Sequence, residues 1–411
     1  MKYGTGHISN SGFLLLLVIA AVCIQSCSEK YPFSEADNLV ETALNDSLFA
    51  GAVLLVGSSE EILHQQAFGY ADLIDSEMNR ISNPEVMTTN HVFDLASLTK
   101  VLATTYAVMI LHDRGELHVD DPVYHYLPSF GVTDKQAITL RHLLTHTSGL
   151  MQWFPTFYVA ENAKERLDFI SSRALNWPVG EQRRYSDLGF MVLADIVEKV
   201  SGQSLDQFLD ANLYHPLGLK STLFNPGSGY PHVVSTSHGN PFEKRMVADD
   251  DFGYTIDIDA DSWTAWRNYT LKGEVNDGNA FYTHQGVAGH AGLFSTAADV
   301  YRLLSVLIND GRYNGNQFIT RDTIDIFLTK DSNNQGLGWS MDGGFVQAEN
   351  LSDGSFGHTG FTGTHVVVSP DNDLILILLT NRQHFGVNEG GFYPDLRTLR
   401  TRLAALFFQE E

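Results

Sequence analysis

Strand-like runs near both ends of the chain flank a long section with helical periodicity, and this arrangement restricts the fold more than any other feature. Residues 50–57 and 61–70 are apolar runs separated by three polar residues, which predicts a β-hairpin. Residues 363–370 and 374–380 flank Asp371-Asn372-Asp373, which predicts a second hairpin. We therefore expect an α+β fold, in which one antiparallel sheet from both termini is flanked by helices and an all-helical region is inserted in the middle.

Helices are expected wherever apolar residues recur with a period near 3.6. The expected helical segments are 32–48, 101–111, 138–149, 188–200, 298–307 and 396–408. Gly149 is expected to cap the third of these. Residues 75–91 are expected to form a loop, and the polar stretch 225–279 is expected to form loops that line or cover something.

The overall charge excludes two classes of partner. The chain has 411 residues and a formal net charge of −23, so it repels nucleic acids and anionic membrane surfaces. We expect a small molecule or a peptide as the substrate.

The first residues are typical of an export signal. Residues 13–24 form an unbroken apolar run of signal-peptide length, and the two cysteines, Cys23 and Cys27, lie in it or just after it. Ile24-Gln25-Ser26-Cys27 resembles a bacterial lipoprotein signal, so we expect residues 1–27 to be a signal peptide and Cys27 to be lipidated. The alternative is cleavage near Ser26 that releases an unanchored protein. In either case the mature protein is expected to be exported to the periplasmic side or the cell surface, and the lipid anchor would be its only link to a membrane.

Ser97 and Lys100 are the first candidates for chemistry. They lie three residues apart at an expected helix start, and residues at this spacing share one helix face. A serine hydroxyl becomes a good nucleophile when an adjacent base takes its proton, and a desolvated lysine can be that base. No other lysine in the chain has a serine three positions before it.

Three short segments together carry a family resemblance: Ser97-Leu98-Thr99-Lys100, Tyr185-Ser186-Asp187 and His358-Thr359-Gly360. They resemble the S-x-x-K, Y-x-N and K/H-T-G motifs of the superfamily of class C β-lactamases and penicillin-binding proteins. The similarity extends over about residues 33–408 and is greatest to exported bacterial β-lactamase-related serine hydrolases.

The resemblance implies a β-lactamase/transpeptidase-like fold. The exported domain would occupy residues 28–411, with a sheet subdomain of about 31–95 and 335–411 and a helical subdomain of about 96–334. The active site would lie in the cleft between the two subdomains.

The resemblance also implies roles for individual residues. Ser97 would be the nucleophile, while Lys100 and Tyr185 would share the work of the general base. The backbone N–H groups of Ser97 and Phe361 would bind the oxyanion. Substrate would contact Asp187, His358, Thr359 and Gly360.

Two residues depart from the family pattern. Asp187 stands where the strict family has asparagine, and an ionised aspartate only accepts hydrogen bonds, so it would hold Lys100 in the charged form and favour Tyr185 as the base. His358 stands where penicillin-recognising enzymes have lysine, and a neutral imidazole binds a substrate carboxylate less well.

These departures favour an esterase or a D-amino-acid peptidase, acting on cell-wall peptides or small esters, over a true β-lactamase. A non-catalytic protein that binds peptidoglycan or a partner is the alternative of a different class. An α/β-hydrolase is unsupported, because the chain lacks the G-x-S-x-G motif. We expect no metal and no cofactor, because His142 and His146 lack the glutamate of an H-E-x-x-H motif.

Overall fold

The computed structural model describes Met1 and residues 31–131, 134–348 and 351–408. The predicted signal peptide and its lipidation site at Cys27 lie outside the described residues. Among the described residues, no helix has both the length and the apolar character that crossing a bilayer requires.

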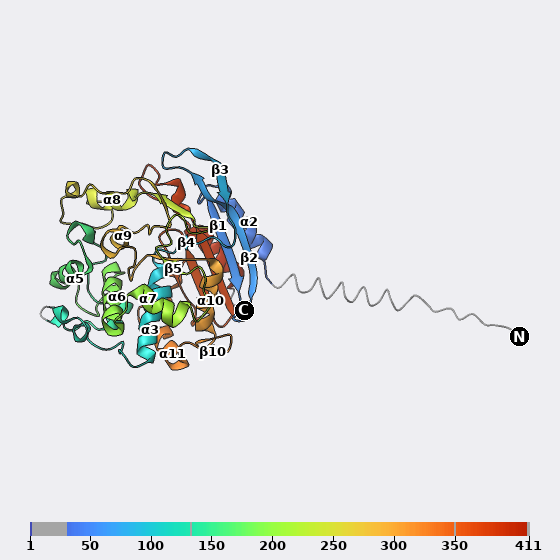
Figure 1. Cartoon of the computed structure of the whole chain (residues 1–411). Coiled ribbons are helices and arrows are strands. Elements are labelled where there is room, and N and C mark those ends of the chain that lie inside the picture. Colours follow the sequence, from blue (N-terminus) through green and yellow to red (C-terminus); the bar gives the residue numbers. More distant parts are fainter. Residues whose placement is uncertain (2–30, 132–133, 349–350, 409–411) are drawn as a thin grey trace.

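A six-stranded antiparallel sheet, which both ends of the chain build, organises the fold (Figure 1). Its order is β11-β12-β13-β1-β2-β3, and the N-terminal strand β1 pairs with the C-terminal strand β13. The strands are β1 (Gly51–Gly57), β2 (Ile62–Ile74), β3 (Arg80–Val86), β11 (Phe356–Thr359), β12 (His365–Ser369) and β13 (Leu374–Thr380). Both predicted hairpins and the α+β class are confirmed.

The central strands are buried on both faces, because successive side chains of a strand point to opposite sides. Leu54 and Leu376 belong to the core beneath α2 (Phe33–Asn45) and α13 (Arg397–Phe407). Val53 and Ile377 belong to the larger core shared with the helical region. Helix α10 (Ala297–Ile308) lies against β1 and β13. The sheet is therefore sandwiched between two layers of helices.

All but one of the remaining helices lie beside the sheet, in the region of residues 96–334 that was predicted to be helical (Figure 1), and the exception is the short helix Gly343–Val346, which contacts β11. The remaining helices are α3 (Thr105–Asp113), α4 (Leu140–Leu144), α5 (Ala163–Ser172), α6 (Asp187–Ser201), α7 (Leu205–Leu209), α8 (Pro241–Ala248), α9 (Gly278–His284), α11 (Arg321–Leu328) and α12 (Gly343–Val346). Short strands connect this region: β4 (Phe93–Asp94), β5 (Leu223–Phe224) and β8 (Leu293–Ser295) form one small sheet, while β6 (Ser235–His238) pairs with β7 (Thr270–Lys272) and β9 (Arg312–Tyr313) pairs with β10 (Asn316–Gln317).

Three local predictions were wrong. Residues 75–91 contain the edge strand β3, which pairs irregularly with β2. The helix expected over 138–149 ends at Leu144, and His146 then adopts a positive φ of 59°. Gly149 is not a cap: a Cβ there would lie 2.1 Å from the carbonyl oxygen of Trp177, so the glycine allows a close approach of two chain segments.

Candidate active site

Ser97 lies in a turn between strand β4 and the buried helix that follows. The preceding residue, Ala96, has a positive φ of 46°, and its N–H donates to Asp94 Oδ1 at 2.8 Å. Asp94 is the last residue of β4 and its side chain thus holds this turn. A π-helical turn, η1 (Lys100–Thr104), continues into α3. The turn brings Lys100 Nζ to 3.1 Å from Ser97 Oγ.

Lys100 is completely buried and is held by two oxygen atoms besides Ser97. Its Nζ lies 2.7 Å from Asp187 Oδ1 and donates to the carbonyl oxygen of His290 at 3.0 Å. Burial alone would lower the pKa of Lys100, but Asp187 and Tyr185 outweigh it, so the pKa lies above its usual value. Lys100 is therefore a protonated ammonium at neutral pH.

The start of α6 positions Tyr185 and Asp187. Ser186 is the N-cap of α6: its Oγ accepts from Gly189 N at 3.2 Å and donates to Met151 O at 2.7 Å. His146 Nδ1 accepts from Ser186 N at 3.0 Å, and the His146 ring lies 4.4 Å from the Tyr185 ring between centroids. These contacts fix the Tyr185-Ser186-Asp187 segment from both sides.

Tyr185 lies within hydrogen-bonding reach of both Ser97 and Lys100. Its pKa is raised above the usual value, because burial disfavours the phenolate more than the Lys100 charge favours it. A neighbouring histidine does not supply a cation, because burial holds the pKa of His146 well below its usual range.

The third motif lies at the end of strand β11. His358 is buried, its Nδ1 donates to Thr359 O at 2.8 Å, and burial followed by the charge of Lys100 lowers its pKa to about 3. The imidazole is therefore neutral at physiological pH. A Cβ at Gly360 would lie 2.5 Å from Leu95 O, so only glycine allows this turn to pack against the segment that carries Ser97.

Phe361 follows that turn and faces the site. Its carbonyl oxygen accepts from Arg382 Nε at 3.0 Å and from Gln383 Nε2 at 3.1 Å, while Thr362 Oγ1 donates to Asp94 O at 2.7 Å. The turn is thereby tied both to the sheet and to β4. Neither the N–H of Ser97 nor that of Phe361 donates to any residue that the structure describes.

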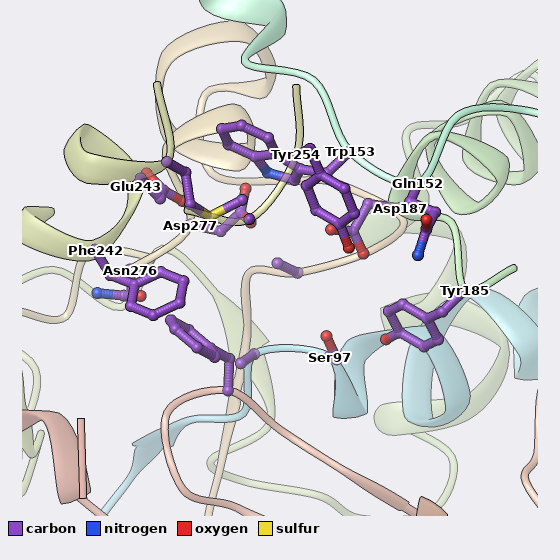
Figure 2. A pocket seen from close by; sticks show the side chains of 15 residues that line it. Ser97, Gln152, Trp153, Tyr185, Asp187, Phe242, Glu243, Tyr254, Asn276 and Asp277 are labelled. Carbon is purple, nitrogen blue, oxygen red and sulfur yellow. The ribbon is translucent and has the colours of Figure 1, made fainter. Parts of the chain in front are cut away.

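A cavity of about 390 Å³ opens at Ser97 (Figure 2). Its lining side chains are those of Ala96, Ser97, Gln152, Trp153, Tyr185, Asp187, Phe242, Glu243, Met246, Tyr254, Asn276, Asp277, Ala291 and Phe361, with Gly253 completing the wall. Four of the predicted site residues, Ser97, Tyr185, Asp187 and Phe361, are therefore brought together at one cavity. His358, Thr359 and Gly360 are not among its lining residues, although the His358 ring centroid lies 5.9 Å from that of Tyr185.

Sequence reasoning missed most of the cavity wall. Phe242, Glu243, Tyr254, Asn276 and Asp277 all belong to the stretch 225–279, which was expected to line or cover something. That expectation is confirmed, but the stretch also contains β6, β7 and α8. No motif in the sequence marks the individual residues, because the positions of their side chains depend on how distant segments pack.

One group of residues has the composition of a metal site. Ligand atoms of Glu85, His91 and His232 lie within 4.8 Å of one another. However, His91 Nδ1 accepts from Thr88 N at 2.9 Å, so Nε2 carries the proton and donates to Glu85 Oε1 at 3.2 Å. The other Glu85 oxygen accepts from Lys272 at 3.1 Å. The ligand atoms of Glu85 and His91 are therefore already engaged in hydrogen bonds.

Comparison with known proteins agrees with this geometry. A model of the Beta-lactamase family matches residues 36–394. The chain is 36% identical over 358 residues to an N-acetylmuramyl-L-alanine amidase of Bacillus subtilis (strain 168), covering 82% of this chain and 78% of that protein. It is 29% identical over 417 aligned positions to a "Putative D-alanyl-D-alanine carboxypeptidase" of Escherichia coli (strain K12), covering 93% of each chain.

The solved structures give the same fold. A class C beta lactamase from Rhodobacter sphaeroides superposes with a TM-score of 0.60 at 20% identity, covering 89% of this chain and 96% of that one. The resemblance to class C β-lactamases and penicillin-binding proteins is thus confirmed. The chain belongs to the beta-lactamase family and is a serine hydrolase with the β-lactamase/transpeptidase-like fold.

Proposed function

We propose that this chain hydrolyses amide bonds of cell-wall peptides through an acyl-enzyme on Ser97. The observation that carries the proposal is the contact of Ser97 Oγ with Lys100 Nζ at 3.1 Å. Ser97 lines the cavity, and Lys100 Nζ in turn lies 2.7 Å from Asp187 Oδ1. The names of the amidase and carboxypeptidase relatives support amide bonds of the cell wall as the target.

Tyr185 is the general base in this proposal, because Lys100 is protonated and has no lone pair to accept a proton. The active form is the minor one in which Tyr185 is ionised, because its pKa is raised, and the fraction in this form grows with pH. In that form the phenolate takes the proton of Ser97 Oγ while the Oγ–carbon bond forms. It then gives that proton to the departing amine as the carbon–nitrogen bond breaks. In the second step Tyr185 takes a proton from water while the water oxygen bonds to the acyl carbon. Tyr185 then returns that proton to Ser97 Oγ as the Oγ–carbon bond breaks and the acid is released.

The backbone N–H groups of Ser97 and Phe361 bind the oxyanion that forms during both steps. Their lack of a hydrogen-bond acceptor among the described residues supports this role. A preorganised donor of this kind contributes on the order of 3 kcal/mol to the transition state. Behind them, Gly360 and Thr359 shape the turn, and His358 supports it as a neutral ring.

A second candidate, hydrolysis of small esters, is favoured by the neutral His358. A fixed cation at this place would help to bind the carboxylate of a penicillin or a C-terminal peptide, and a ring with a pKa of about 3 cannot provide one at neutral pH. The same observation disfavours efficient β-lactam hydrolysis. We also propose that the protein acts outside the cytoplasm, anchored through Cys27 after removal of residues 1–26.

Intact-protein mass spectrometry tests the acyl-enzyme. Residues 28–411 are treated with a fluorophosphonate and with penicillin, and turnover of a peptidoglycan-derived peptide, a p-nitrophenyl ester and nitrocefin is measured on the same samples. Ser97→Ala is compared with Ser172→Ala, which changes an exposed serine of α5.

We expect a fluorophosphonate adduct and peptide turnover that Ser97→Ala abolishes and Ser172→Ala retains. Ester turnover without peptide turnover would favour the second candidate. Rapid nitrocefin turnover would favour a β-lactamase. Absence of any adduct and of any turnover would favour the non-catalytic binding protein, and turnover that Ser97→Ala leaves unchanged would contradict an acyl-enzyme on Ser97.

A further inference from the structure

The charges that line the active-site cavity have one sign. Asp187, Glu243 and Asp277 contribute carboxyl groups, and none of the residues that line the cavity in the described structure is a lysine, arginine or histidine. Lys100 lies beneath this lining and is paired with Asp187. The other two carboxyl groups therefore face the cavity without a lysine of their own.

Glu243 and Asp277 lie next to each other, in the upper part of the view in Figure 2, with Ser97 and Tyr185 in the lower part. Both oxygens of Glu243 accept from the N–H of Gly278, at 2.9 and 3.1 Å. A Cβ at position 278 would lie 2.4 Å from Glu243 Oε2, so this close approach requires glycine. Glu243 is thus held in a fixed position by the backbone.

Asp277 is held in a similar way through one of its oxygens. Its Oδ1 accepts from Ala280 N at 2.8 Å and from His290 Nε2 at 2.9 Å. The side chain is 20% exposed, which leaves Oδ2 available to the cavity. The two carboxyl groups are preorganised and do not need to move to meet a ligand.

Among the described residues Glu243 makes no ion pair, whereas Asp277 is paired with His290 at 2.9 Å. The nearby Arg267 donates instead to Val275 O and Asn276 O, both at 2.7 Å. Burial and then the charge of Asp277 raise the pKa of Glu243 to about 8. At pH 7 most of the Glu243 carboxyl is therefore protonated, and a cation placed beside it favours loss of that proton, so that the carboxylate and the cation form an ion pair.

The rest of the wall suits a cation as well. Trp153 and Tyr254 lie nearly parallel, with ring centroids 6.4 Å apart and an interplanar angle of 23°, and Phe242 and Phe361 meet edge to face at 5.0 Å. The faces of aromatic rings attract ammonium groups, and such contacts strengthen when water is excluded. Carboxylates and aromatic rings together are a common binding environment for organic ammonium ions.

We propose that Glu243 and Asp277 form a subsite for a primary ammonium group of the substrate, on the opposite side of the cavity from Ser97. The substrate would be an amide or ester whose reactive carbonyl lies near a free amino group. A free carboxylate at the same place would meet the negative charge of Asp277 and be rejected. This proposal rests on the function proposed for Ser97, but the ammonium subsite can be tested without turnover.

Binding is measured by calorimetry at pH 7 on the Ser97→Ala protein, which does not turn over. The probes are D-alaninamide, which carries an ammonium group, and D-lactamide, in which a neutral hydroxyl replaces that group. Glu243→Gln is then added, because glutamine keeps an oxygen for the Gly278 N–H and loses only the ability to ionise beside a bound ammonium group. Glu41→Gln, an exposed position on α2, is the matched control.

We expect D-alaninamide to bind at least tenfold more tightly than D-lactamide in Ser97→Ala and in the Glu41→Gln control, and this preference to disappear with Glu243→Gln. Equal binding of the two probes, binding of neither, or a preference that persists in Glu243→Gln would overturn the proposal. Thermal unfolding of each variant confirms that it is folded.

Kinetics separate the two proposals. If Ser97→Ala abolishes turnover but N-acetylated and free-amine p-nitroanilides of D-alanine react equally, the acyl-enzyme stands and the ammonium subsite fails. If calorimetry shows the preference but Ser97→Ala leaves turnover unchanged, the subsite stands and the role of Ser97 fails.

Discussion

Replacing Asp187 with asparagine gives the sharpest test of how the proton moves in this site. The change removes one negative charge from a pair whose atoms, Lys100 Nζ and Asp187 Oδ1, lie 2.7 Å apart, and it hardly changes the shape of the side chain. At this separation and an effective dielectric constant of about 20, the Coulomb attraction is roughly 6 kcal/mol. The asparagine oxygen still accepts a hydrogen bond from Lys100, which is worth about 1.5–3 kcal/mol.

The net loss of about 3–4 kcal/mol corresponds to a fall of about 2–3 in the pKa of Lys100, at 1.36 kcal/mol per pH unit. Asp187 also raises the pKa of Tyr185, so its removal lowers that pKa too. With Tyr185 as base and Lys100⁺ as its support, activity requires a deprotonated tyrosine and a protonated lysine. Both limbs of the pH profile of kcat/KM therefore move to lower pH in Asp187→Asn.

The assay is the pH dependence of kcat/KM for a p-nitrophenyl ester between pH 5 and about 10.5, a range that spans the ordinary pKa values of tyrosine and lysine. We expect wild-type activity to rise towards alkaline pH, and Asp187→Asn to show a bell-shaped profile with a falling limb about 2–3 pH units below that of the wild type. Asp168→Asn, which removes an exposed partner of Lys164, is the control and leaves the profile unchanged. A variant whose activity rises at neutral pH without a falling limb would identify neutral Lys100 as the base and refute this reasoning.

Three further predictions address the base, acid stability and the sheet. Tyr185→Phe keeps the ring and removes the hydroxyl, so kcat for the ester should fall by about 10²–10⁴; a change below tenfold would contradict a base role. His358, His365 and His384 are buried with pKa values of about 3, below the unfolded value near 6.5, so the folded state stays neutral while the unfolded state binds protons. The free energy of unfolding is therefore highest above pH 6.5 and falls towards pH 3, by about 1.4 kcal/mol per pH unit for each histidine. Denaturant unfolding at pH 7 and pH 5 measures this fall, and equal stability at the two pH values would argue against neutral, buried histidines. Leu376→Ala opens a cavity under α2 and α13 and should cost about 2–5 kcal/mol in urea unfolding, and a loss under 1 kcal/mol would show that this core is loosely packed.

Much of the fold was predictable because its signals are local. The strands around Leu54 and Leu376 are apolar enough to be buried on both faces, so their sequence alone predicts central strands. Strand β3 gave no such signal: it is a largely polar stretch with Asn83-Pro84, and it is a strand only because the edge of β2 offers it hydrogen-bond partners. The helix that ends at Leu144 was predicted too long, because the contact of His146 with Ser186 pulls the chain out of helical geometry.

The candidate site, like the fold, was predicted only in part from the sequence. The residues of the three motifs were found by their short-range spacing, and the structure brings Ser97, Lys100, Tyr185 and Asp187 together. The expectation that Asp187 holds Lys100 followed from the chemistry of a carboxylate, and the 2.7 Å contact agrees with it. The expectation that His358 contacts substrate stays a prediction. Its ring is buried and is not among the residues that line the cavity.

The sequence by itself determined the family and the sheet built from both termini, and it predicted Ser97 as the nucleophile, because apolar periodicity and motif spacing can be read without a three-dimensional structure. Only the tertiary structure decided which groups surround the substrate. Glu243 and Asp277 are 34 positions apart and belong to no motif, yet Gly278 brings them to one wall. Their charge and pKa depend on burial and on each other, and both of these arise only when distant segments pack around the same cavity.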